Sequence, residues 1–369
     1  MEEWREATIA FRRQRPALVP NNIGVGTLAW GNRERGYGIR FHRADLQQVF
    51  DTLVDGGVSF FDTSHAFGAG MRDGGQCAEQ LLGECAAHYH GRGTPAFGTT
   101  YAPGGLFGGN QRSVASALDA SCDRLGLASV DLFQVPARRS FDWPIGLPFG
   151  WPFGGKSSAA LLGGAALAHQ RGLCSAVGVR GVRGGKAVLA AHAALAAEGI
   201  ELASVGADLS LLDQSALADG TLAACRQLGV PLLASAPLAR GLASGRFTAM
   251  NPTGGRDDES SRASRGPRGG AGRFGFDELR RALPLHASLD RVARAVTRRE
   301  KRPVTPAQVA INWVVAKGAA PLPGVCTLAD AHEVLGCVGW ALDDGDVAAL
   351  DRAAAKAKAS GRIDFDSPF

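Results

Sequence analysis

The chain contains 369 residues, of which 45% are hydrophobic and 20% are charged, and its formal net charge is +5. This composition predicts a globular protein with a sizeable core, and so mild a positive charge gives no argument for nucleic-acid binding. The seven cysteines include no C-x-x-C pair, which argues against a metal site or a disulfide framework and favours a reducing compartment. No apolar stretch reaches about 18 residues, so we expect no membrane span.

The first twenty residues, MEEWREATIAFRRQRPALVP, begin with two acids and contain no apolar core of the kind that secretory signals have. They are not typical of a transit peptide either. No targeting segment is therefore readable from them, and whether a leader has been removed stays open.

From residue 22 onward, apolar strand-like segments alternate with segments whose apolar residues recur at helical spacing. Strands are expected at 22–30, 58–64, 96–101, 129–135, 174–180, 202–210, 231–237 and 321–324. Helices are expected at 43–57, 76–90, 113–126, 158–172, 185–199, 215–229, 289–299, 305–318 and 328–340. Two irregular stretches interrupt this alternation, a loop at 136–156 that is rich in Pro, Trp and Gly, and a polar insert at 246–276.

About eight strands that alternate with helices predict an α/β protein with a parallel sheet. Eight such units favour a (β/α)8 TIM barrel with long loops at its C-terminal face, which typically needs about 250 residues before insertions. We expect a single domain over 1–369 with its barrel core at about 20–345. The alternative is an open doubly wound sheet, but GVGTLAWG at 24–31 lacks the G-x-G-x-x-G spacing typical of that fold.

Several motifs occur in an order and spacing that resemble the aldo-keto reductases. They are IGVGTLAWG, LVDGGVSFFDTSHAFG, EQLLGE, ALDASCDRLGLASVDLFQV, GLCSAVGV, GVPLLASAPLARG, TPAQVAINWVVAKG and PLPGV. GNRERGYG and GCVGWALDDGDVAALD are similar to the plant plastid and cyanobacterial branch of that family. The resemblance runs from about residue 20 to 356 and implies the same barrel fold, although fold alone does not establish function.

The resemblance implies a reductase that uses NADPH and a tetrad of tyrosine, lysine, histidine and aspartate. Asp62 matches the aspartate of that tetrad, in DTSHAFG. Phe67 stands where the family has its proton-donating tyrosine, Thr100 replaces the lysine, and Pro136 replaces the histidine. None of these three replacements can do the work of the residue it replaces, because general acid catalysis requires an ionisable donor near the substrate oxygen.

The positions that hold the cofactor in the family are altered in the same way. By resemblance, Arg180 and Gly206 replace a serine and a glutamine that contact nicotinamide, and Ser235 replaces the aromatic ring that stacks on it. Cys326 stands in place of the lysine for the 2′-phosphate, and Val334 in place of an asparagine for adenine. The remaining candidates for contacts with a dinucleotide are Leu238, Gly241, Arg246 and Glu333. We therefore expect NADPH to bind weakly or not at all.

The three tyrosines and His65 are the residues to consider as replacements for the missing acid. Tyr37 lies in the first loop of the active-site face, whereas Tyr101 follows Thr100 on a strand and should point to the opposite face. Tyr89 ends a helix at the other mouth of the barrel. His65 is more consistent with a loop histidine that has no chemical role.

Arg180 offers a different solution for the retained carboxylate. An aspartate left without its lysine would be costly to bury. The arginine fork suits a carboxylate, so we predict that Arg180 fills the empty cofactor pocket and pairs with Asp62. The alternative is that Arg180 turns outward to solvent.

Two functions remain open. The first is a degenerate barrel that serves as a binding or assembly subunit, with a protein partner bound by loop 136–156 through Phe141, Trp143 and Trp151. The second is an NADPH-dependent aldo/keto reductase with an altered site.

The arginines of the insert at 246–276 are opposed by acids and are better explained as part of a flexible loop than as a nucleic-acid surface. The family branch suggests a chloroplast location, and the cytoplasm is the alternative.

Overall fold

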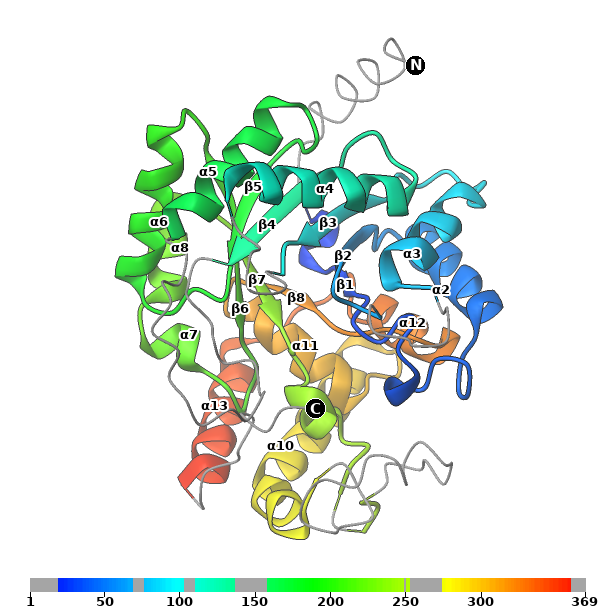
Figure 1. Ribbon diagram of the computed structural model, residues 1–369. Helices are drawn as coiled ribbons and strands as arrows, with labels where there is room; N and C mark the ends of the chain where they lie inside the picture. The colour runs from blue at the N-terminus through cyan, green and yellow to red at the C-terminus, as the bar shows by residue number, and fades with distance from the viewer. Residues whose placement is uncertain are drawn as a thin grey trace.

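The computed structural model describes residues 19–68, 76–102, 110–136, 158–248, 250–252 and 274–359. These residues form eight parallel strands that follow one another around the sheet in sequence order, with helices outside them (Figure 1). The predicted (β/α)8 barrel is confirmed. Residues 1–18, the insert from 253 to 273 and all of the 136–156 loop except Pro136 lie outside the described residues.

The strands are short and mostly buried, which fits a sheet covered by helices on its outer face. They are β1 (Val25–Gly26), β2 (Phe60–Ser64), β3 (Ala96–Thr100), β4 (Leu132–Pro136), β5 (Val177–Arg180), β6 (Leu202–Asp208), β7 (Leu232–Ser235) and β8 (Ala320–Leu322). Their register aligns Thr100 with Gln134, and Arg180 with both Pro136 and Gly206. The residues at the carboxyl ends of neighbouring strands are thereby brought side by side.

The helices surround the strands and shield them from solvent (Figure 1). They are α2 (Arg43–Asp55), α3 (Ala78–Ala87), α4 (Gln111–Leu125), α5 (Ser158–Gln170), α6 (Gly185–Ala197), α7 (Ser215–Ala218), α8 (Thr221–Leu228), α10 (Phe276–Glu300), α11 (Pro306–Ala316), α12 (Leu328–Leu335) and α13 (Asp344–Ala359). Short 3-10 turns are η1 (Pro20–Asn22), η2 (Arg33–Arg35) and η3 (Ala239–Ser244).

Some predicted boundaries were wrong. The segment 215–229 is two helices, because Gly220 between them takes a left-handed conformation with φ of 82° that a helix cannot contain. The strand expected at 22–30 reduces to Val25–Gly26, and the helix expected at 289–299 extends from Phe276 to Glu300. Helix α13 was not predicted as an element at all.

The barrel closes where its first and last strands meet. Gly26 forms an isolated parallel bridge with Gly324, and the N–H groups of Gly24 and Gly26 donate to the carbonyl oxygens of Pro321 and Pro323 at 3.1 and 2.9 Å. The indole N–H of Trp30 reinforces this closure by donating to the carbonyl of Val325 at 2.8 Å.

Two hydrophobic clusters make up the core. The larger cluster lies between the strands and the surrounding helices. The smaller cluster consists mainly of strand residues on the opposite face, because successive side chains of a strand point to opposite faces. The smaller cluster contains Val19, Phe60, Ala96, Leu132, Leu233, Ala320 and Leu322. It fills the barrel interior below the carboxyl ends of the strands and so forms the floor on which polar side chains rest.

A buried charged group also lies outside the barrel, which we call the Glu79 cluster (Glu79, Arg124, Thr99 and Ser121). The Glu79 carboxylate is fully buried; it accepts from Nε of Arg124 at 2.6 Å and from the Thr99 hydroxyl at 2.6 Å. Arg124 also donates to the Ser121 hydroxyl at 2.9 Å. The cluster thus connects β3 to α3 and α4.

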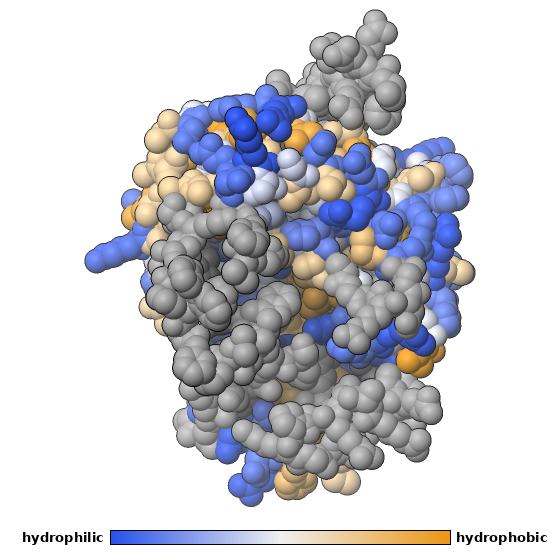
Figure 2. Space-filling model, in the orientation of Figure 1, coloured by the Kyte–Doolittle hydropathy of each residue, from blue (hydrophilic) through white to orange (hydrophobic). Residues whose placement is uncertain are grey.

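On the face seen in Figure 2, the described surface is mainly hydrophilic with hydrophobic residues scattered between. The large hydrophobic residues that are exposed within the described part of the chain are Leu28, Ile39, Leu189, Met250, Phe276, Leu283 and Leu328. No described helix is long and apolar enough to cross a membrane.

Candidate functional site

The inward-facing residues of the strands form layers along the barrel axis, because every second side chain of a strand points to the same face. Above the apolar floor come Asp62 of β2, Gln134 of β4 and Ser204 of β6, all of which are buried. The next layer toward the carboxyl ends contains Thr100, Arg180, Gly206 and Ser235. The barrel mouth is therefore lined by polar residues contributed by six strands.

Arg180 is at the centre of this mouth. One of its terminal nitrogens donates to Oδ2 of Asp62 at 2.6 Å and to the Thr100 hydroxyl at 3.2 Å. The other donates to the Ser235 hydroxyl at 2.8 Å. The predicted ion pair between Arg180 and Asp62 is confirmed, and the alternative of an outward-turned arginine is wrong.

Asp62 receives a second polar contact. The side-chain amide of Gln134, which is fully buried, donates to Oδ1 of Asp62 at 3.0 Å. Each carboxylate oxygen thus has a donor, which is the condition for holding a buried charge. We call these five residues (Arg180, Asp62, Thr100, Gln134 and Ser235) the Arg180 cluster.

Gly206 gives Arg180 the space that it occupies. A Cβ atom at position 206 would lie 2.9 Å from Cγ of Arg180 and 3.1 Å from Oε1 of Gln134. The Cγ atom is close to the backbone of Arg180 and has little freedom to move away. A residue with a side chain at 206 is therefore incompatible with the observed position of the arginine.

The pKa of Arg180 is set by two opposing effects. Burial alone would lower it, but the adjacent Asp62 carboxylate and its hydrogen bond more than offset this and raise the Arg180 pKa above its ordinary value. The arginine side chain is 23% exposed and the Asp62 side chain only 2%. Arg180 is consequently charged at every pH of interest, and its partner carboxylate is the more deeply buried of the two.

The other positions expected from the tetrad carry no proton donor. Phe67 lies in the loop after β2, where its ring is half-buried and packs against the main hydrophobic core. Pro136 ends β4 in register with Arg180. Thr100 is part of the Arg180 cluster, in which its hydroxyl accepts hydrogen bonds.

The tyrosines weighed as replacements make contacts elsewhere. Tyr37 packs edge-on against Phe41 with ring centroids 5.8 Å apart, and burial followed by the nearby Glu84 carboxylate raises its pKa, which makes it a weaker acid. Tyr101 is 5% exposed and belongs to the core outside the barrel, as strand alternation predicted. Tyr89 donates to Asp55 at 2.5 Å.

His65 lies beside Tyr101, with ring centroids 5.8 Å apart. Its Nδ1 accepts from the N–H of Ala102 at 3.5 Å, and burial lowers its pKa. A neutral histidine in these surroundings is consistent with the structural role expected from the sequence.

The four remaining cofactor candidates separate into two regions. Leu238 and Gly241 belong to the turn after β7, where Ala239 and Arg240 take left-handed φ values of 49° and 58°. Such strain in residues other than glycine needs support from the surrounding structure. Arg246 and Glu333 are engaged with other side chains near α12, Arg246 with Asp330 at 3.2 Å and Glu333 with the Thr305 hydroxyl.

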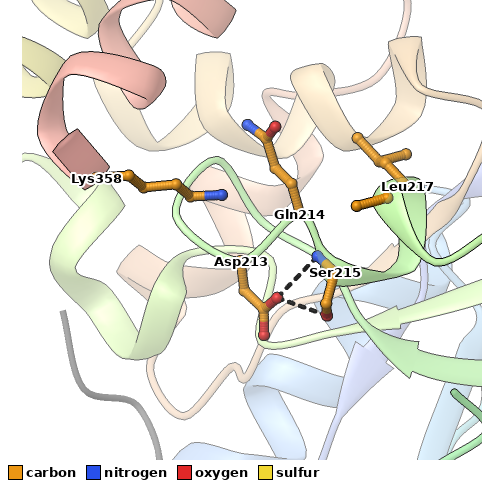
Figure 3. A pocket seen from close by; sticks show the side chains of 6 residues that line it. Asp213, Gln214, Ser215, Leu217 and Lys358 are labelled. Atoms are coloured by element: carbon orange, nitrogen blue, oxygen red, sulfur yellow. Dashed lines mark hydrogen bonds between the residues drawn. The ribbon is translucent and has the colours of Figure 1, made fainter. Parts of the chain in front are cut away.

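A pocket of about 550 Å³ lies apart from the Arg180 cluster, between the loop that follows β6 and the end of α13 (Figure 3). Asp213 accepts hydrogen bonds from the backbone N–H and the hydroxyl of Ser215 at 3.0 and 2.7 Å. Lys358 extends over the pocket from α13 (Figure 3), and burial lowers its pKa. None of the residues that line this pocket was singled out from the sequence.

A sequence profile of the Aldo/keto reductase family matches residues 22–355. The chain belongs to this family. It is 28% identical over 345 residues to the chloroplastic pyridoxal reductase of Arabidopsis thaliana, covering 91% of this chain and 84% of that protein. It is 27% identical over 314 residues to an uncharacterized oxidoreductase of Mycobacterium tuberculosis, covering 85% of this chain and 81% of that protein.

Solved structures of the family share the fold at lower identity. The glycerol dehydrogenase of Gluconobacter oxydans superposes with a TM-score of 0.65 at 18% identity, covering 93% of this chain and 94% of that one. A thermostable aldo-keto reductase in complex with the inhibitor epalrestat gives a TM-score of 0.60 at 17% identity, with coverages of 90% and 94%. Aldo/keto reductases generally use NADP(H).

The residues at the mouth of this aldo/keto reductase barrel do not fit a nicotinamide ring. Stacking requires an aromatic face, whereas Ser235 presents a hydroxyl that is bound to Arg180. The side chain of Arg180 extends from the end of β5, and its guanidinium group reaches Asp62 on β2 and Ser235 on β7. No step of hydride transfer can be derived through these groups.

Sequence reasoning missed Gln134. Gln134 lies in the motif FQVP, in which the family resemblance concerns the proline. Strand alternation could have found it, because Gln134 precedes Pro136 by two residues and so shares its face. A glutamine in a strand buried on both faces indicates an internal hydrogen-bond partner.

Proposed function

We propose that the protein is an aldo/keto reductase family member that does not reduce carbonyls by the family's chemistry and acts instead as a binding or assembly subunit. One observation carries the proposal. Arg180 contacts Asp62, Thr100 and Ser235 and requires Gly206, and by resemblance these are positions of the catalytic tetrad and the cofactor pocket. The altered residues therefore fit one another and form one hydrogen-bonded unit.

The chemistry supports this reading. Phe67 has no proton to transfer, and the loss of general acid catalysis alone lowers a rate by roughly 10²–10⁴-fold. Asp62, which by resemblance would hold a lysine, is bound to Arg180 at 2.6 Å and is thereby removed from reaction chemistry. NADPH binds weakly or not at all in this proposal, because the space for its ring holds a side chain.

The binding role is assigned to loop 136–156, which begins at the carboxyl end of β4. Phe141, Trp143 and Trp151 of this loop are residue types enriched at the centres of protein interfaces. We propose a protein partner rather than a nucleic acid. We also propose a location in the chloroplast, because the similar pyridoxal reductase of Arabidopsis thaliana is chloroplastic.

A second candidate is an NADPH-dependent reductase with an altered site. The similarity to a pyridoxal reductase favours it, since that similarity covers 91% of this chain. In this case a different group would have to donate the proton, and the Arg180 cluster would have to open to admit the cofactor.

The two candidates are separated by titration of the full-length protein with NADPH, followed by assays on a panel of aldehydes and quinones. We expect neither measurable affinity at micromolar concentration nor reduction. A turnover of about 1 s⁻¹, the low end of ordinary enzymes, would contradict the proposal. In that event Tyr37→Phe is the next variant to assay, because Tyr37 is the tyrosine expected in a loop of the active-site face of the barrel.

A further inference from the structure

The N-terminus of α12 lies at the other end of the region where, by resemblance, a dinucleotide would bind. Position 326, which is Cys326 here, corresponds to the lysine for the 2′-phosphate. One carboxylate oxygen of Asp330 accepts from the backbone N–H groups of Cys326 and Thr327 at 3.3 and 3.2 Å. It also accepts from the Thr327 hydroxyl at 2.9 Å. Thr327 and Asp330 thus form the capping box of α12, in which the Asp330 carboxylate occupies the helix N-terminus, where an anion would otherwise be favoured.

One arginine pairs with the same carboxylate. The second oxygen of Asp330 accepts from Arg246 at 3.2 Å, and the two side chains are 40% (Arg246) and 21% (Asp330) exposed. Arg246 was a candidate for a phosphate contact. The positive charge of Arg246 is balanced by the Asp330 carboxylate of the same chain.

Glu333, the other candidate, is also committed. Its carboxylate accepts from the hydroxyl of Thr305, the residue that caps α11, and its backbone carbonyl accepts from Gln308 at 3.2 Å. A carboxylate that anchors α12 to α11 in this way cannot turn toward an adenine without breaking the anchor.

We propose that Asp330 is an internal occupant of the anion site at the α12 N-terminus and excludes the phosphorylated adenosine end of a dinucleotide. An incoming 2′-phosphate would find a carboxylate on the donors it requires, and the two like charges would repel. The exclusion is local to α12, so it is independent of the Arg180 cluster and of the proposed function.

The test uses adenosine 2′,5′-bisphosphate, which carries both phosphates and the adenine but no nicotinamide. Isothermal titration calorimetry of the full-length protein should detect no binding. Asp330→Ala removes the occupant and frees Arg246, and we expect affinity for the bisphosphate to rise at least about tenfold. Arg246→Ala in the Asp330→Ala background should abolish the gain.

Asp343→Ala is a matched control. Asp343 also accepts from a backbone N–H at a helix N-terminus, that of Asp346 at 2.7 Å, and also pairs with an arginine, Arg299 at 2.8 Å. The Asp343→Ala variant should leave affinity for the bisphosphate unchanged.

Asp330→Asn keeps the shape of the side chain and removes its charge. It carries the test if Asp330→Ala does not fold, and it should show a smaller gain in affinity.

Two results would overturn the proposal. One is micromolar binding of the bisphosphate to the unaltered protein. The other is a folded Asp330→Ala or Asp330→Asn protein whose affinity equals that of the unaltered protein. Because the probe contains no nicotinamide, either result is separate from the outcome of the reductase assays.

Discussion

The Arg180 cluster and the Glu79 cluster are both built around a buried ion pair, the first on the inner face of the barrel sheet and the second on its outer face. Each contains a carboxylate that is almost fully buried and an arginine 2.6 Å away that is 23% or 29% exposed. Thr99 serves the outer pair and Thr100 the inner pair, because adjacent residues of β3 point to opposite faces. The outer pair has an evident structural task, the docking of α3 and α4 on β3.

The likeness is informative because only the inner pair stands where catalysis would be expected. An ion pair of the outer kind needs no chemistry to explain it. Buried pairs of this type are often no more stable than apolar packing, but removing one partner is costly, since the other charge is left unpaired. The inner pair joins β5 to β2 at the barrel mouth, and the comparison can be tested by breaking each pair in turn.

The largest effect is expected from Arg124→Ala. Glu79 is fully buried, and without Arg124 its carboxylate would keep only the Thr99 hydroxyl. We expect the free energy of unfolding to fall by about 3–5 kcal/mol, measured by urea denaturation at pH 7. A loss below about 1 kcal/mol would mean that water reaches the carboxylate, and the outer pair would then contribute little to the docking of α3 and α4 on β3.

Arg180→Met should cost less, about 1–3 kcal/mol in the same measurement. Asp62 would keep its hydrogen bond from Gln134 at 3.0 Å, and the open mouth would admit water to the other oxygen. The matched comparison is with Arg124→Met. If Arg180→Met is the more destabilising of the two, the inner carboxylate depends on its arginine more than the outer one does, and the expected order is wrong.

Gly206→Ala is expected to cost about 1–2 kcal/mol, because the added methyl group would overlap Cγ of Arg180 at 2.9 Å. In the Arg180→Ser background the same substitution should be nearly neutral. A double-mutant cycle measures this coupling directly. Additive effects of the two substitutions would show that Gly206 and Arg180 are independent changes rather than one fitted unit.

The smallest effect on stability is expected from the combined variant Trp143→Ala and Trp151→Ala. These residues belong to the proposed partner-binding loop, so the free energy of unfolding should change by less than about 0.5 kcal/mol. Co-purification of a partner from native extract should be lost. Unchanged recovery of that partner would place the contact on another surface, and Phe276→Ala on α10 is the control from an exposed apolar position.

Much of this architecture was predictable from the chain. The alternation of strands and helices predicted the barrel. The family resemblance placed Arg180 near Asp62, and the need to neutralise a retained carboxylate suggested their pairing, with an outward-turned arginine as the alternative. The helix boundary at Gly220 was not predictable from periodicity, since the apolar pattern continues through it, and only its positive φ reveals the break. Helical periodicity also predicted only the second half of α10, and its first half contains Pro284, a residue type that argues against a helix interior.

The details of the site needed coordinates for a physical reason. Gln134 and Gly206 act through contacts with residues far apart in sequence, Asp62 and Arg180. Which side chains meet across a barrel depends on the stagger of all eight strands, and a sequence pattern reports only the face on which each residue lies. The same limit applies to Asp330, whose contacts with Cys326 and Arg246 no sequence pattern predicted.

The closure of the barrel between β1 and β8 has a consequence for how the molecule opens. Pro321 and Pro323 of this seam have no backbone N–H, so they donate no hydrogen bond across it, and their carbonyls accept from Gly24 and Gly26. Strand β1 contributes only two residues, whereas β2 pairs with β3 over five. Amide protons of Gly24 and Gly26 should therefore exchange with solvent deuterium before those of β2 and β3, and transient opening of the barrel begins at this seam.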